Sequence, residues 1–173
     1  MKSSSDTSLN ARVRIPKSHP QIELRGKLDS LNANITMFQA ASGNSEYIAD
    51  LEEVRGVVTR LQKCEAGEKV FSDRLVLWGL DEDEIHERSH NPAKYYGIGH
   101  ILPHYDMGRE AAGINLLRTI VRETEVAACR AYDGDDGLRI IHVLNRLSSA
   151  LYILTYKYLP KSYNRVMRFG SPE

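Results

Sequence analysis

The chain has 173 residues, of which 42% are hydrophobic and 27% charged, so it is long enough to form one domain with a buried core. Basic and acidic side chains number 23 each, which leaves no net positive charge to attract nucleic acid or an acidic membrane surface. We therefore expect neither partner, and an anionic ligand must be bound by a local cluster of cations.

The first half of the chain predicts an arm followed by two helices. Residues 1–20 are polar, contain two prolines and show no periodicity, so we expect an extended N-terminal arm. From residue 21 to about 43, apolar residues recur every three or four positions, which is typical of a helix. A second helix, capped by Asn44 or Ser45, is expected to run to about residue 61. The segment 64–78 either continues that helix after a break at Gly67 or forms a separate short helix.

The second half predicts three more helices. A short one over residues 81–90 begins with four acidic residues, which suit a helix N-terminus, and ends at Asn91-Pro92. Residues 95–103 are predicted to form an irregular loop. Long helices are expected over 107–132 and 138–158, the second ended by Pro160.

No stretch alternates with a period of two, so we predict an all-α fold. It is an antiparallel five-helix bundle over residues 21–160, with the arm 1–20 before it and a tail 161–173 after it.

Cationic side chains gather on the helix over 107–132. Arg118, Arg122 and Glu125 are spaced i, i+4 and i+7 and share one helix face. Two guanidinium groups there match the oxygens of a triphosphate, and Asp29 on the first helix is a candidate partner that orients an arginine. The alternative interpretation is a solvated helix face with ordinary ion pairs.

Polar residues also interrupt the last helix. Asn145 lies in the run LNRLSS, where an amide, a guanidinium and two hydroxyls stand among leucines. This pattern fits a binding site or, as an alternative, a buried polar network that sets the register of the bundle.

Two histidines have a spacing that allows a shared metal ion. His86 and His90 stand at i, i+4, with His100 and His104 close behind, but an HExxH motif is absent and no set of four ligands has a recognisable spacing. We therefore predict no metal site.

The arm contributes a further group of candidates. Its polar and basic side chains suit a phosphate, although the alternative is a disordered tail: Thr7, Ser8, Arg12, Arg14 and Lys17.

Targeting signals and cysteines point to the cytoplasm. Residues 1–5 do not begin the apolar stretch of a signal peptide, and no apolar run approaches the roughly 20 residues of a membrane span. Cys64 and Cys129 match no metal motif, so free thiols in a reducing compartment are expected.

Several ungapped motifs resemble the corrinoid adenosyltransferase superfamily, and specifically its ethanolamine-utilisation branch. They agree in order and spacing from about residue 9 to 158, and they are GLDEDEIHERSHNP (79–92), NLLRTIVRETE (115–125) and LNRLSSALY (144–152), with PKSHP (16–20) and LDS (28–30) before them.

The resemblance implies a trimer of five-helix bundles that binds ATP, with Mg²⁺, between neighbouring subunits. It assigns ATP binding to Thr7, Ser8, Lys17, Arg122, Glu125 and Asn145, and it implies that Arg118 pairs with an acid at the position of Asp29. Cob(I)alamin would attack the 5′ carbon of the ribose, so the protein must align two reactants and neutralise the leaving polyphosphate.

The chain departs from this family pattern in three places. The glycine-rich TxxGDxG arm is reduced to Thr7-Ser8, and an upstream His/Cys metal segment of the H…CCxxC kind is lacking. The phenylalanine that displaces the lower axial base of cobalt falls at His100, with Tyr95, Tyr96 or Tyr105 as possible substitutes. On this basis His100, Tyr95 and Tyr96 are the candidate cobalamin-binding residues.

The resulting hypothesis is an ATP:cob(I)alamin adenosyltransferase that serves ethanolamine utilisation. Its partners would be ATP, a cobamide, two further copies of the chain and a cobalamin-dependent ammonia-lyase, in the cytoplasm or within a bacterial microcompartment. The rival hypothesis is a catalytically weak carrier or chaperone for a cobamide or nucleotide on the same trimeric fold.

Overall fold

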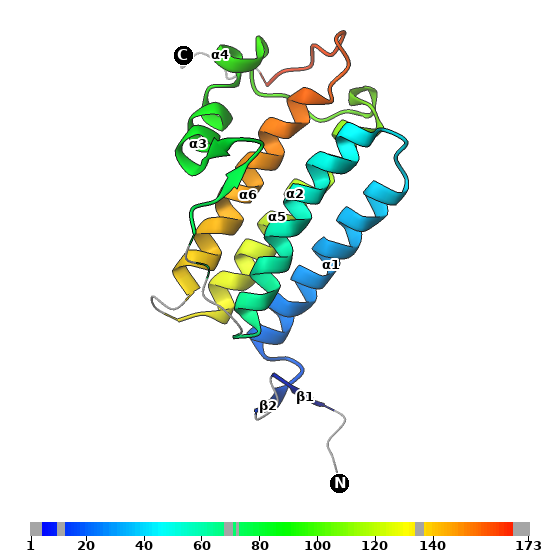
Figure 1. The fold of residues 1–173 in the computed structure, drawn as a ribbon. Helices are drawn as coiled ribbons and strands as arrows, with labels where there is room; N and C mark the ends of the chain where they lie inside the picture. The colour runs from blue at the N-terminus through cyan, green and yellow to red at the C-terminus, as the bar shows by residue number, and fades with distance from the viewer. Residues whose placement is uncertain (1–4, 10–12, 68–70, 72, 134–136, 168–173) are drawn as a thin grey trace, which may run out of the picture.

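The computed structural model describes residues 5–9, 13–67, 71, 73–133 and 137–167. Within these residues, four long helices lie side by side, and neighbours run in opposite directions (Figure 1). They are α1 (Pro20–Ala40), α2 (Ser45–Glu65), α5 (Arg109–Ala131) and α6 (Leu138–Lys157). The short helix α3 (Glu82–His90) packs on α6, and the single turns α4 (Pro92–Tyr96) and η1 (Tyr105–Met107) follow it. The mostly helical fold predicted from the sequence is confirmed.

Two short antiparallel ribbons depart from the prediction of a chain without strands. In the arm, β1 (Asp6–Ser8) pairs with β2 (Arg14–Pro16); further on, β3 (Val76–Leu77) pairs with β4 (Leu80–Asp81). Strands of two or three residues are too short to show a periodic pattern. Trp78 and Gly79, which join β3 to β4, both have positive φ angles, as a tight hairpin turn requires.

The prediction of further helix over 64–78 was wrong for the described part of that segment. Helix α2 ends at Glu65, and Gly67 takes a positive φ that a helix cannot continue. The loop predicted over 95–103 was wrong at its start, because α4 reaches Tyr96. Pro92 occupies the first turn of α4, and Gly97 ends it in the left-handed conformation.

Capping side chains account for where α1, α2 and α3 begin. His19 accepts a hydrogen bond from the Gln21 amide at α1, and Asn44 caps α2. Asp81 and Glu84 form a reciprocal capping box at α3.

The core consists of the apolar stripes predicted on the long helices. Among the stripe residues, Leu24, Leu28, Leu31, Ile35, Ile114, Leu117, Val121, Leu144, Leu147 and Leu151 are all buried. None of the described helices is long and apolar enough to cross a membrane.

A buried carboxylate ties the connection before α3 to the bundle. Glu82 accepts hydrogen bonds from the Leu75 amide at 2.7 Å, from Arg139 at 2.6 Å and from His142 at 3.1 Å. Burial alone would raise the pKa of Glu82, but the bonds from Arg139, Leu75 and His142 outweigh it and lower the pKa to about 2.

We predict that Glu82→Gln lowers the free energy of unfolding by about 1–3 kcal/mol, because an amide group cannot accept from all three donors. Because the folded-state pKa lies below the unfolded one, the wild type loses this stability as the pH falls from about 5 to 2. Thermal unfolding followed by circular dichroism measures both effects. Asp83→Asn, on the exposed face of α3, is the control; equal melting of both variants would contradict the prediction.

Candidate functional site

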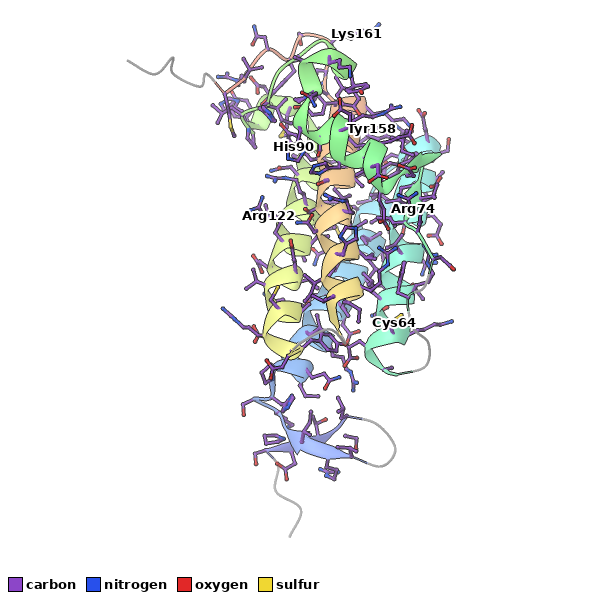
Figure 2. The ribbon with its side chains drawn as sticks, turned by 90° about the vertical axis from the view of Figure 1, so that its left-hand side faces the viewer. Cys64, Arg74, His90, Arg122, Tyr158 and Lys161 are labelled. Carbon is purple, nitrogen blue, oxygen red and sulfur yellow. The ribbon has the colours of Figure 1, made fainter. Side chains whose placement is uncertain are left out.

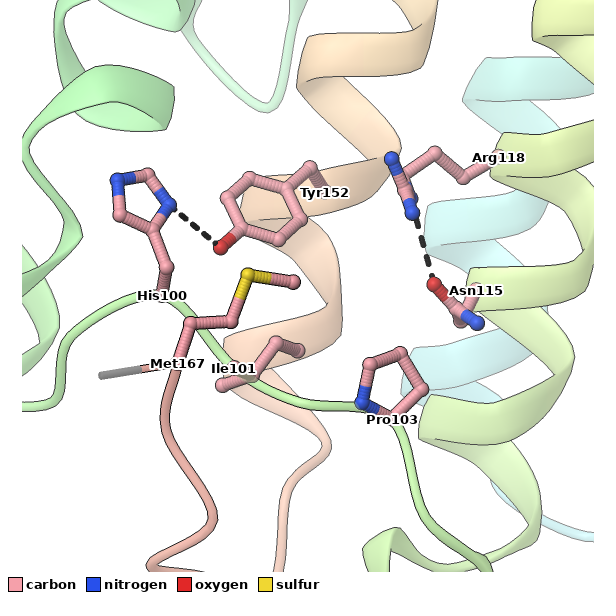
Figure 3. Close-up of a pocket in the computed structure, with 7 residues that line it drawn as sticks. All are labelled: His100, Ile101, Pro103, Asn115, Arg118, Tyr152 and Met167. Atoms are coloured by element: carbon pink, nitrogen blue, oxygen red, sulfur yellow. Dashed lines mark hydrogen bonds between the residues drawn. The ribbon is translucent and has the colours of Figure 1, made fainter. Parts of the chain in front are cut away.

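A cavity of about 240 Å³ opens beside α5 and α6, at the loop that precedes η1 (Figure 3). Four structural segments contribute its lining: His100, Ile101 and Pro103 from the loop, Asn115 and Arg118 from α5, Tyr152 from α6, and Met167 from the C-terminal segment. Ile101, Pro103 and Met167 form an apolar wall, whereas Arg118, Asn115 and His100 provide polar groups. This combination suits a ligand with an apolar body and a charged part.

Arg118 is the charged group of the cavity. Its Nε donates to Asn115 Oδ1 at 3.3 Å, and its guanidinium lies 5.6 Å from the centroid of the Tyr152 ring. Burial, together with the positive charge of Arg122, lowers the pKa of Arg118, although a guanidinium stays protonated at neutral pH. No carboxylate within the described chain forms an ion pair with Arg118. The half-buried charge therefore favours an anionic ligand.

The pairing of Arg118 with Asp29 is not formed within one chain. Asp29 is exposed on α1 and accepts a hydrogen bond from Gln62 Nε2 at 2.8 Å, so it faces α2. Arg118 instead lies on the side of α5 that faces Tyr152 of α6. Within the described chain, α1 and α5 direct these two side chains to different neighbours, and the pairing stays a prediction.

A chain of hydrogen bonds holds the orientation of His100. The Tyr156 hydroxyl lies 3.0 Å from the Gly99 carbonyl and 2.8 Å from the Tyr152 hydroxyl, and burial raises the pKa of Tyr156, so it stays a donor. The Tyr152 hydroxyl is in turn hydrogen-bonded to His100 Nδ1 at 2.9 Å. The imidazole is therefore held in position by Tyr152, which Tyr156 and the Gly99 carbonyl support.

The two tyrosines predicted beside His100 lie outside the cavity lining. Tyr96 stacks on Tyr156 with ring centroids 4.7 Å apart, so it supports a residue of the hydrogen-bond chain without lining the cavity. Tyr95 is exposed and lies beside Arg88 and Lys94, whose cations are 5.3 and 4.7 Å from its ring. Of the three candidate cobalamin residues, the structure places only His100 in the cavity.

A polar row continues from Arg118 along α5 and α6. Asn145 Nδ2 donates to Glu125 Oε1 at 3.0 Å, which joins the two helices, and Arg146 donates to Asn145 Oδ1 at 3.2 Å. Arg122 is exposed on the same face of α5 and forms no hydrogen bond or ion pair with another described residue. Since Asn145 is also exposed, the interpretation of this row as a buried network is wrong. It is a surface on which donors and one carboxylate remain accessible.

The arm forms a second, separate group. β1 carries Thr7 and Ser8, and the Lys17 amide donates to the Ser5 carbonyl at 2.8 Å, so the predicted arm residues share one hairpin; Arg12 lies outside the described residues. This hairpin projects beyond the start of α1, whereas Arg122 lies partway along α5 (Figures 1 and 2). One chain therefore brings together Arg118, Arg122, Glu125 and Asn145 but leaves the arm apart from them.

Hydrogen bonding disfavours a metal ion shared by His86 and His90. Arg146 can only donate, so the 2.9 Å contact makes His86 Nδ1 the acceptor and places the ring hydrogen on Nε2. His90 Nδ1 donates to the His86 carbonyl at 2.9 Å. Burial, followed by the charge of Arg146, lowers the pKa of His86 and keeps the ring neutral. Ligation through His86 Nε2 would require the opposite tautomer and the loss of the Arg146 contact.

Sequence reasoning missed several residues of the cavity. Asn115 and Tyr152 stand in the quoted motifs, but only the structure shows that they hold Arg118 and His100. The sequence did not indicate Met167, because the C-terminal tail contains no recognisable motif or periodicity. It reaches the cavity because its amide donates to the His100 carbonyl at 2.7 Å and Val166 bridges Ile101.

Comparison with known proteins gives a consistent result. The cobalamin adenosyltransferase family matches residues 2–158. A corrinoid adenosyltransferase EutT from Salmonella typhimurium is 34% identical over 152 residues, covering 86% of this chain and 56% of that protein. EutT from Escherichia coli K12 is 35% identical over 154 residues, with the same coverage. The chain thus spans about half the length of the curated relatives it matches.

A solved structure shows a similar fold. It is a Phe-to-His variant of a PduO-type ATP:corrinoid adenosyltransferase from Lactobacillus reuteri, complexed with cobalamin and ATP. Its TM-score is 0.67 at 17% identity, over 94% of this chain and 95% of that one.

We predict that chelator-treated protein contains no stoichiometric zinc or iron, because His86 is held in the tautomer that cannot bind a metal through Nε2. Elemental analysis of purified protein checks this, with His86→Ala as the matched variant. About one metal ion per chain that disappears in His86→Ala would contradict it.

Proposed function

The chain belongs to the cobalamin adenosyltransferase family, and from this premise we propose that it transfers the 5′-deoxyadenosyl group of ATP to the cobalt of a reduced cobamide. The observation that carries the proposal is Arg118, a half-buried cation without a carboxylate partner in the described chain, in a cavity whose other wall is apolar. A polyphosphate and a corrin ring have the matching properties.

In the proposed reaction, the electron pair of cob(I)alamin forms the cobalt–carbon bond at the ribose 5′ carbon. The carbon–oxygen bond breaks, and its electrons leave with the triphosphate. The protein therefore needs to align the reactants and stabilise negative charge on the leaving group, with little proton transfer. Arg118 and Arg122, one helical turn apart, are placed to do this.

Mg²⁺ would arrive with ATP and share the charge of the polyphosphate. Glu125 would supply a hard oxygen donor for this ion, and its other contact is the hydrogen bond from Asn145. His100 is proposed to face the corrin, with Tyr96 supporting its hydrogen-bond chain; Tyr95, exposed beside Arg88, would contact only the periphery.

The complete site is proposed to form between copies of the chain. Thr7, Ser8 and Lys17 lie on a hairpin that projects away from the arginine row of their own chain, so the arm of a neighbour is the source that would complete the site. The same arrangement would let Asp29 of one copy meet Arg118 of another. We propose the homotrimer on these grounds.

We propose a biological setting from the names of the relatives. EutT proteins are named corrinoid adenosyltransferases, so we propose a role in ethanolamine utilisation in the cytoplasm, within or beside a microcompartment, with a cobalamin-dependent ammonia-lyase as the consumer of the product.

The decisive experiment mixes the protein with MgATP and chemically reduced cob(I)alamin and follows the loss of cob(I)alamin absorbance. We expect catalytic turnover that depends on both ATP and protein. Tight binding of ATP and cobalamin without turnover would instead support the rival carrier or chaperone.

We predict that Arg122→Ala lowers kcat/KM by roughly 30- to 1,000-fold, which corresponds to about 2–4 kcal/mol of lost transition-state stabilisation. Melting should stay close to that of the wild type, because Arg122 is exposed and forms no hydrogen bond or ion pair with another described residue. Arg130→Ala, on the same helix with only a surface ion pair to Glu23, is the control. A fully active Arg122→Ala variant would show that Arg122 only faces solvent.

We also predict a trimer in sedimentation velocity at micromolar concentration with MgATP present. The charge exchange Asp29→Arg with Arg118→Asp should restore assembly that either single change weakens, if the two residues meet between copies. A stable monomer under these conditions would overturn the shared site.

A further inference from the structure

Arg25, on the second turn of α1, joins three parts of the chain. Its Nε and Nη2 donate to the two carboxylate oxygens of Glu65 at 2.8 and 3.0 Å, at the end of α2. Its Nη2 also donates to the Leu9 carbonyl at 2.9 Å, and Nη1 to the Ser8 carbonyl at 3.4 Å. The guanidinium therefore connects the bundle to the last residues of β1 and the start of the hairpin loop.

The pair with Glu65 makes this connection rigid. The Glu65 side chain is 2% exposed, so its carboxylate depends on Arg25 for charge compensation, whereas the Arg25 side chain is 29% exposed and keeps an edge toward the arm. The hydrogen bond from Arg25 to Glu65 outweighs burial and raises the pKa of Arg25. A planar fork can bind a carboxylate on one edge and carbonyls on another, which a lysine cannot do.

The arm residues that the structure describes also form backbone hydrogen bonds within the hairpin itself. The Lys17 amide bonds to Ser5 and the Leu9 amide to Val13, so these bonds hold the hairpin together without holding it to the helices. Loss of the guanidinium fork would therefore remove the hydrogen bonds that tie Ser8 and Leu9 of the hairpin to α1.

We propose that Arg25, held by Glu65, is the positioning residue for the ATP-binding arm. This rests on the proposed function, in which Thr7 and Ser8 contact the polyphosphate. By fixing the carbonyls of Ser8 and Leu9, Arg25 sets the direction in which the hydroxyls of Thr7 and Ser8 point, without touching a reactant itself. Its loss should reduce ATP affinity and leave the arginine row and the cavity beside His100 intact.

The test separates this role from a general effect on stability. Arg25→Lys keeps the charge beside Glu65 but loses the fork, and we expect a roughly tenfold rise in the KM for ATP, the effect of one or two hydrogen bonds. The KM for cob(I)alamin and the kcat at saturating ATP should stay within about twofold. Arg74→Lys, in the exposed ion pair with Asp83, is the matched control and should behave as the wild type.

A double variant guards against misfolding. Arg25→Met alone would leave the buried Glu65 carboxylate without a positive partner. The double variant Arg25→Met with Glu65→Met therefore removes both charges together. We expect this pair to melt near the wild-type temperature, to show the raised KM for ATP, and to exchange the amide hydrogens of Leu9 and Lys17 faster than the wild type, while the core amides of α1 and α2 stay protected.

Each outcome has a distinct meaning. A double variant with the wild-type KM for ATP and unchanged exchange at Leu9 and Lys17 would overturn the positioning role while the proposed function stands. A wild-type protein that neither binds MgATP in calorimetry nor turns over would overturn the proposed function and this inference together.

Discussion

A half-buried guanidinium without a carboxylate in its own chain sets the conditions for the rest of the site. Arg118 is partly shielded from water in the cavity beside α6 and the loop before η1, and its contacts are an amide oxygen and the face of an aromatic ring. Both contacts reduce the free-energy cost of removing the guanidinium from water, but neither neutralises its charge. Leaving this charge half-buried lowers the stability of the free protein by a modest amount. Binding of an anion would recover that free energy. The neighbouring Arg122 adds a second positive charge, and because it is exposed it can bind the same ligand.

The opposite wall of the cavity is held by hydrogen bonds rather than by packing alone. The chain of hydrogen bonds from the Gly99 carbonyl through Tyr156 and Tyr152 to His100 fixes the position of the imidazole. The C-terminal segment contributes as well: the Leu102 amide donates to the Arg165 carbonyl at 3.0 Å, and Tyr163 donates to the Leu102 carbonyl. The tail beyond α6 is therefore part of the wall that holds His100.

The long helices could be predicted from the sequence because each has a stripe of apolar residues that a bundle must bury, and the start of α2 is also marked by the Asn44 cap. Short elements could not be predicted. The ribbon at Trp78-Gly79 uses a non-glycine residue at positive φ, and α4 is one turn fixed by Pro92 and Gly97. The arginine row was found because the i, i+4, i+7 spacing is local. The Tyr152–His100 bond and the Arg25–Glu65 fork join residues 52 and 40 positions apart, which no periodicity encodes.

The two groups of proposed ATP ligands differ in how they are attached, and this difference has a consequence for binding. Arg118, Arg122, Glu125 and Asn145 project from α5 and α6, whose buried stripes pack against each other along their length, so their backbone positions are set by the core. Thr7 and Ser8 stand on a ribbon of three residues per strand, and among the described residues the Arg25 guanidinium hydrogen-bonds it to the bundle. A two-stranded ribbon of this size is at best marginally stable alone. Ordering of the arm therefore falls largely on Arg25, and ATP affinity should be sensitive to that contact, whereas alignment of the reactants should depend on the helices.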